Sequence, residues 1–147
     1  MTTMTLLELI NHHAAALDAA GVSYGHGTAN AQDEAAWLVL WQLGLPLDTP
    51  LDNALDGEES ESNRPVTPAQ QAQVAILFEK RITTRKPAAY LTQEAWLQGV
   101  PFYVDERAIV PRSFIAELLA DGSIDYWLGE HTQRVLDLCT GNGSLAV

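Results

Sequence analysis

The sequence is poor in cysteine, in basic residues and in long apolar runs, and each shortage excludes a class of protein. Cys139 is the only cysteine, so no disulfide can form within the chain. A reducing cytoplasm is therefore the expected setting. The longest strongly apolar stretch runs from Ala35 to Trp41, far short of the roughly 20 residues that cross a bilayer. The N-terminus lacks a basic segment, so neither a signal peptide nor a membrane partner is expected.

The shortage of basic residues bears on the kind of partner. Eight Lys and Arg face 19 Asp and Glu, which gives a formal net charge of −11. A chain this acidic lacks the positive surface of a nucleic-acid-binding protein, so no direct nucleic-acid partner is expected. A basic protein would be attracted. Hydrophobic residues make up 47% of the chain, enough to bury a core, which excludes wholesale disorder.

Apolar spacing predicts two helices in the first third of the chain. Residues three and four apart share a helical face over about residues 6–20, and Gly21 is a stop signal. The members of this apolar face are Leu6, Leu9, Ile10, His13 and Leu17. After a turn-rich segment, Asn30 is the expected N-cap of a second helix that Gly44 ends.

A third helix is predicted after residue 67. Thr67 can cap it, Pro68 suits its first position, and Gln70 completes a capping box. Its apolar stripe comprises Val74, Leu77, Phe78 and Ile82, and its C-terminal end carries Lys80, Arg81, Arg85 and Lys86. The helix dipole favours positive charge at that end. We expect the three helices to form a small bundle.

An acidic stretch, Asp48 to Asn63, separates the second and third predicted helices. Its composition favours a solvated connector. The alternative is a docking patch for a basic protein, which the net charge permits without requiring it.

The sequence pattern changes from helix-like to strand-like after Pro87. Ala95–Leu97 and Phe102–Val104 read as the strands of a hairpin whose turn contains Gly99 and Pro101. Residues 108–110 would extend the second strand. Ser113 is the expected N-cap of a helix that follows.

The C-terminal segment carries the most specific pattern. Val135–Cys139 has the length and character of a buried parallel strand. A glycine-rich turn over residues 140–144 follows, and residues 145–147 would begin a helix. Glycines let a ligand approach the backbone, and the N–H groups of a helix start attract anionic groups. The spacing is neither the dinucleotide fingerprint nor the P-loop. A simple strand-to-helix turn is the alternative.

The spacing of Asp137, Gly141 and Gly143 resembles the first motif of class I S-adenosylmethionine-dependent methyltransferases. Residues 86–91 and 102–112 are similar to the segments that precede the catalytic domain in the protein-(glutamine-N5) methyltransferases, the HemK/PrmB family. Tyr24–Thr28, and the sequence that follows Pro111-Arg112, resemble the branch that acts on the third protein of the large ribosomal subunit.

The resemblance implies a mainly α chain in three parts. Residues 1–86 would be a helical substrate-recognition domain, 87–112 a β-hairpin linker, and 113–147 the incomplete start of an α/β Rossmann-like methyltransferase domain. The cofactor would be S-adenosylmethionine and the partner a basic ribosomal protein. The implied cofactor-binding residues are Asp137, Thr140, Gly141, Gly143 and Arg112. For Arg112, a surface charge at a helix start is the alternative interpretation.

The family's catalytic Asn-Pro-Pro-Tyr tetrapeptide occurs nowhere in the sequence. No catalytic residue and no metal site are therefore assigned. We expect an N-terminal portion of a longer cytoplasmic enzyme that is inactive by itself, with an unpaired terminal strand through which copies would self-associate. Two alternatives remain. The helical part would be a non-catalytic module that docks a basic protein, or the protein would be a nucleic-acid adenine methyltransferase, against which the negative charge argues.

Overall fold

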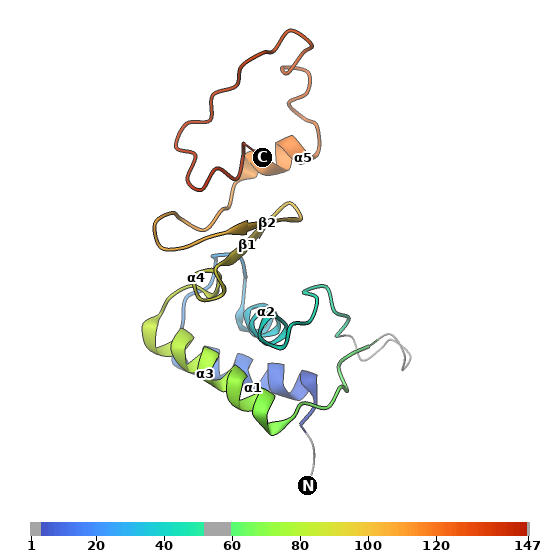
Figure 1. The fold of residues 1–147 in the computed structure, drawn as a ribbon, viewed down its shortest axis with the longest axis vertical. Helices are drawn as coiled ribbons and strands as arrows, with labels where there is room; N and C mark the ends of the chain where they lie inside the picture. The colour runs from blue at the N-terminus through green and yellow to red at the C-terminus, as the bar shows by residue number, and fades with distance from the viewer. Residues whose placement is uncertain (1–3, 52–59, 147) are drawn as a thin grey trace. The chain divides into compact units, whose positions relative to one another are not determined.

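A computed structural model of the chain describes residues 4–51 and 60–146. The chain divides into two compact units, Met1–Thr92 and Gln93–Val147. Within the described residues, the first contains four helices and the second contains a β-hairpin and one helix, which Figure 1 labels. The expected boundary was residue 86, but the short helix α4 (Ala88–Thr92) lies in the first unit, where Ala88 joins the buried core.

The first unit is built from α1 (Leu6–Ala20), α2 (Ala31–Leu43) and α3 (Pro68–Thr84), each of which packs against the other two (Figure 1). The whole predicted face of α1 is buried, which confirms the helical spacing. The largest fully buried apolar side chains of this core are Leu6, Leu9, Ile10, Leu17, Leu38, Val39, Leu40, Val66, Val74 and Phe78. The predicted helical bundle is therefore present.

The helix ends follow local capping rules. Asn30 accepts a hydrogen bond from the backbone N–H of Asp33 at 2.9 Å, as expected of an N-cap. Thr67 and Gln70 form the predicted capping box, with Pro68 at the start of α3. A second capping box, between Thr5 and Glu8 at the start of α1, was not predicted. The Thr-x-x-Glu spacing was the signal for it.

The acidic stretch is described only at its two ends, because residues 52–59 lie outside the described ranges. The proposed docking patch therefore falls mainly on residues that are not described. At its C-terminal end, the N–H of Leu6 donates to the carbonyl of Arg64 and the N–H of Leu7 to that of Ser62. These bonds attach the segment before α3 to the start of α1.

The second unit begins with β1 (Glu94–Leu97) and β2 (Val100–Tyr103), which pair antiparallel and confirm the predicted hairpin. Gln98 and Gly99 form a two-residue turn with φ of 49° and 77°, as in a type I′ hairpin. Pro101 lies in β2 opposite Trp96 rather than in the turn. A two-stranded sheet has only edge strands, where proline is tolerated.

The predicted extension of the second strand over residues 108–110 is wrong. The chain turns immediately after β2, and the N–H of Ala108 donates to the carbonyl of Asp105 at 3.2 Å. The next element is α5 (Phe114–Ala120), whose N-cap is the predicted Ser113.

The predicted strand over Val135–Cys139 is also wrong. Residues 121–146 are described, and they form turns and irregular backbone without a strand or helix. Val135, Leu136 and Leu138 are 77%, 80% and 76% exposed. A parallel strand needs hydrogen-bonded neighbours and covered faces, whereas β1 and β2 of this unit pair with each other. The Rossmann-like sheet is thus absent from the described residues, and residues 135–139 form no terminal strand. Self-association of copies stays a prediction.

Candidate functional site

The glycine-rich segment after Val135 folds as a series of tight turns. The N–H of Gly143 donates to the carbonyl of Thr140 at 2.8 Å, and the N–H of Ala146 donates to that of Gly143 at 3.0 Å. The expected helix start is not formed at residues 145 and 146, and Val147 lies outside the described residues. The loop is therefore held by its own backbone hydrogen bonds.

Gly141 and Gly143 have φ of 59° and 83°, in the left-handed region that side chains rarely adopt. A Cβ atom added at either position would meet no atom within 4 Å. The requirement for glycine is thus conformational, and the space beside both residues is open. This geometry suits a backbone that a ligand approaches closely.

Two polar atoms at this loop lack partners. Oδ2 of Asp137 and Nδ2 of Asn142 are buried and make no hydrogen bond within the described part of the chain. Such atoms cost free energy unless a partner satisfies them. One is an acceptor and the other is a donor. Asn142 was not among the predicted site residues, although its position between the two glycines was a signal.

The unpartnered carboxylate oxygen can accept a hydrogen bond from a hydroxyl or ammonium group of a ligand. Asp137 supplies the free carboxylate oxygen, and Gly141 and Gly143 supply the approachable backbone. Thr140 joins them through its carbonyl bond to Gly143. Arg112 is exposed and lies directly before Ser113, the N-cap of α5.

A cavity of about 290 Å³ lies beside this loop, within the second unit. Its lining residues are Leu97, Gln98, Val100, Phe102, Ala116, Leu119, Ala120, Ser144 and Leu145. The hairpin, α5 and the end of the glycine loop therefore meet around one mostly apolar hollow. None of the five predicted cofactor-binding residues lines it.

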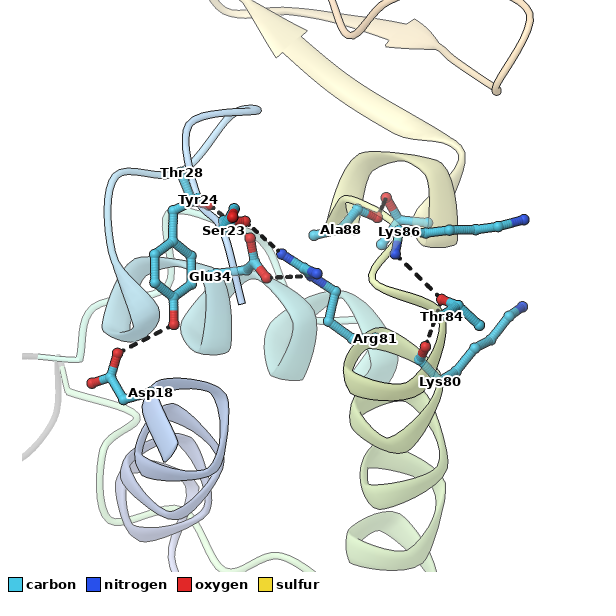
Figure 2. Close-up of polar contacts among 11 residues, drawn as sticks. Asp18, Ser23, Tyr24, Thr28, Glu34, Lys80, Arg81, Thr84, Lys86 and Ala88 are labelled. Carbon is cyan, nitrogen blue, oxygen red and sulfur yellow. Dashed lines mark hydrogen bonds and ion pairs between the residues drawn. The ribbon is translucent and has the colours of Figure 1, made fainter. Parts of the chain in front are cut away.

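The first unit holds a buried ion pair that sequence reasoning did not identify. Nε of Arg81 on α3 lies 2.6 Å from Oε1 of Glu34 on α2, and the two side chains are 2% and 4% exposed. Figure 2 shows the guanidinium group of Arg81 reaching across to α2 and to the chain after α1. From the sequence, Arg81 is one of several cations expected at the end of α3. Glu34 lies among the acidic residues in the first turn of α2.

The ion pair is connected to both ends of the segment Ser23–Thr28. Nη2 of Arg81 donates to the carbonyl of Ser23 at 2.9 Å. The hydroxyl of Thr28 donates to the second oxygen of Glu34 at 3.0 Å (Figure 2). Within the segment, the N–H of Gly25 donates to the carbonyl of Thr28 at 2.8 Å. The pair thus anchors a closed surface turn.

Tyr24 adds a third anchor to this segment. Its hydroxyl donates to Oδ1 of Asp18 near the end of α1 at 3.2 Å (Figure 2). Burial and the negative charge of Asp18 both raise the pKa of Tyr24. The tyrosine therefore remains a neutral hydrogen-bond donor at physiological pH.

The described part of the chain holds neither a cluster of metal-binding side chains nor a membrane-spanning helix. Residues 4–51 and 60–146 contain no group of three or more His, Cys, Asp or Glu side chains placed to hold a metal ion. Among the helices in these ranges, none has the length and apolar character needed to cross a membrane.

The chain is similar to known proteins along almost its whole length, although no family profile matches it. It is 50% identical to a protein of Bordetella pertussis over 145 residues, 48% to one of Burkholderia pseudomallei over 144, and 44% to one of Neisseria meningitidis over 145. Each alignment covers 97% of this chain but only 46%, 44% and 45% of the relative. The chain thus spans about half the length of the curated relatives that it matches.

The class of these relatives is that of the protein-glutamine methyltransferases. Each of the three carries the name ribosomal protein uL3 glutamine methyltransferase. The chain is a homologue of the ribosomal protein uL3 glutamine methyltransferases and corresponds to an N-terminal portion of them.

Proposed function

We propose that the chain is the N-terminal portion of an S-adenosylmethionine-dependent enzyme that methylates a glutamine side-chain amide of ribosomal protein uL3. The observation that carries this proposal is 50% identity over 97% of the chain to a relative of that name. Identity of this extent covers both units, so it includes the glycine loop as well as the helices. The chain itself contains no Asn-Pro-Pro-Tyr tetrapeptide, so it would be inactive alone.

The cofactor would be held at the glycine loop. Oδ2 of Asp137 offers an unsatisfied acceptor, while Gly141 and Gly143 leave the backbone open to close approach. Thr140 stabilises the turn between them through its carbonyl. Arg112, which is exposed before α5, would contact a carboxylate group. When bound, S-adenosylmethionine supplies an activated methyl group, and these residues bind and orient it.

Each of the three parts of the chain would have a separate function. Residues 1–86 would recognise the protein substrate, 87–112 would link, and 113–147 would begin the catalytic domain. The net charge of −11 would favour encounter with a basic ribosomal protein in the cytoplasm, because opposite charge accelerates association. No membrane or direct nucleic-acid partner is part of this proposal.

A non-catalytic helical docking module is the alternative. It would account for similarity in the first unit, whereas the alignments cover 97% of the chain and so extend through the second unit. The alternative is therefore not favoured.

A chimera tests the proposed function. This chain replaces the matching segment of the Bordetella pertussis relative, which supplies the remaining half, and transfer of labelled methyl groups to purified uL3 is measured. We expect transfer by the chimera, a strong loss in Asp137→Ala, and full activity in the matched control Asp125→Ala, an exposed aspartate outside the loop. If the relative methylates uL3 and a folded chimera does not, the proposed function is wrong.

A further inference from the structure

The segment Ser23–Thr28, here called the clamped turn, is a surface turn with unusually strong anchoring. Its tip residues Gly25, His26 and Gly27 are exposed, whereas both of its ends are hydrogen-bonded to a buried ion pair. Surface turns ordinarily rely on their own backbone and on water. Tyr24–Thr28 are also among the residues that resemble one branch of the family. Neither the glycine loop nor the absent Asn-Pro-Pro-Tyr tetrapeptide explains why these residues are anchored.

The ion pair serves to position the clamped turn more than to stabilise the protein. Two charges removed from water lose hydration, and an apolar pair of similar volume is often as stable or more stable. Arg81 and Glu34 nevertheless lie nearly fully buried at 2.6 Å. Each also bonds one end of the clamped turn: Arg81 donates to the carbonyl of Ser23, and Glu34 accepts from the hydroxyl of Thr28. The pair therefore defines where the turn begins and ends.

The backbone at the tip of the clamped turn is open to close approach. Gly25 and Gly27 have φ of 103° and 110°, and neither carries a side chain that would keep a partner from the backbone. A Cβ at Gly27 would lie 3.4 Å from the ring of Trp37 on α2, so the turn packs closely on the helix beneath it. Between the two glycines, the exposed imidazole of His26 projects from a supported backbone.

The charges around the clamped turn favour a basic partner. Exposed carboxylates lie at Asp18, which bonds Tyr24, and at Asp33, which bonds the N-cap Asn30. The positive charge of Arg81 is neutralised by Glu34. Arg85, an exposed cation that follows α3, donates to the carbonyl of Ala20 at the end of α1. The exposed carboxylates of Asp18 and Asp33 thus lie at the two helices that the clamped turn connects.

We propose that the clamped turn is the element of the helical unit that contacts the protein substrate, and that Arg81, Glu34 and Thr28 are positioning residues that hold it ready. The expected occupant is a basic segment of uL3 that lies along the exposed glycines and against His26. A turn ordered before binding loses less conformational freedom when the partner docks. This inference rests on the proposed function, because uL3 enters only through it.

The test measures binding of the 147-residue chain to purified uL3 by calorimetry. Thr28→Val removes the hydroxyl that donates to Glu34 and keeps the shape of the side chain, whereas Thr28→Ser keeps the donor. We expect about tenfold weaker binding for Thr28→Val and nearly unchanged binding for Thr28→Ser. Circular dichroism verifies that both variants are folded at the temperature used, so that a purely structural loss is separated from a loss of positioning.

A second pair of variants avoids the buried network altogether. His26→Ala alters the exposed tip, and His12→Ala alters an exposed histidine on α1 away from the turn. We expect weaker binding for the first and unchanged binding for the second. If Thr28→Val and His26→Ala both bind uL3 as tightly as the unmodified chain, or if that chain does not bind uL3, the inference is overturned. Methylation by the chimera decides separately on the proposed function.

Discussion

Arg81 on α3 and Glu34 on α2 form a buried ion pair with 2.6 Å between Nε and Oε1, although they lie 47 positions apart in the sequence. Around this pair, two helices and the turn between α1 and α2 are joined by hydrogen bonds (Figure 2). The core of the first unit is therefore not purely apolar. Arg81, which is 1% exposed, is placed where it bonds a carboxylate and a carbonyl.

Breaking this pair from one side should be costly. We expect Arg81→Met to lower the free energy of unfolding by about 3–5 kcal/mol, because Glu34 would remain buried and uncompensated. The double variant Glu34→Leu with Arg81→Met removes both charges and should cost less than the single one. Urea unfolding of the three proteins measures this. Equal or greater loss in the double variant would contradict the explanation.

We expect the free energy of unfolding to decrease at acid pH because of His13. Burial against Phe78, with ring centroids 4.1 Å apart, and the neighbouring His12 lower the pKa of His13 to about 4 from 6.5. Above pH 6.5 the imidazole is neutral in both states. Between pH 6.5 and 4 the unfolded chain binds a proton that the native chain rejects, so the free energy of unfolding decreases by about 1–3 kcal/mol.

Thermal unfolding from pH 8 to 4 checks this dependence. Other carboxylates titrate in the same range, so the difference between the unmodified chain and His13→Leu is the relevant curve. The difference should change below pH 6.5 and be flat above it. His131→Leu, at an exposed position in the second unit, should behave like the unmodified chain. A pH profile that His13→Leu leaves unaltered would disprove the role of His13.

We expect trypsin to cleave after Arg134 and after Arg81 at different rates. Arg134 lies on exposed, irregular backbone of the second unit, whereas Arg81 is 1% exposed within α3. A protease needs an extended, accessible segment, so cleavage after Arg134 should come first. Mass spectrometry of a limited digest measures the order. Cleavage after Arg81 at an equal rate in the native protein would contradict the packing of α3 described above.

The chain alone should bind S-adenosylmethionine weakly or not at all. Asp137, Gly141 and Gly143 form the loop, but no strand leads into it and no helix follows it among the described residues. A ligand at a hundredfold excess over its Kd stabilises the native state by about 2.7 kcal/mol. We therefore expect no appreciable rise in Tm with millimolar cofactor. A rise that Asp137→Ala abolishes would show that the loop is already formed for binding.

Local interactions explain what could be predicted from the residues. The ends of α2 and α3 follow from Asn30, Thr67 and Gln70, because a cap bonds a backbone group three positions away. The hairpin likewise follows from a turn of two residues, Gln98 and Gly99. The same signals were present at Thr5 and Glu8. The partners in these interactions are close in the sequence, so the interactions form independently of the tertiary fold.

The remaining features depend on tertiary contacts. The sequence alone predicts the helical bundle, the hairpin and the glycine spacing of Asp137, Gly141 and Gly143. It did not determine that Arg81 would leave the group of terminal cations and be buried against Glu34, because α2 and α3 meet only after folding. Nor did it determine the state of residues 135–139, since an apolar run becomes a strand only when neighbouring strands bond its edges and other residues cover its faces.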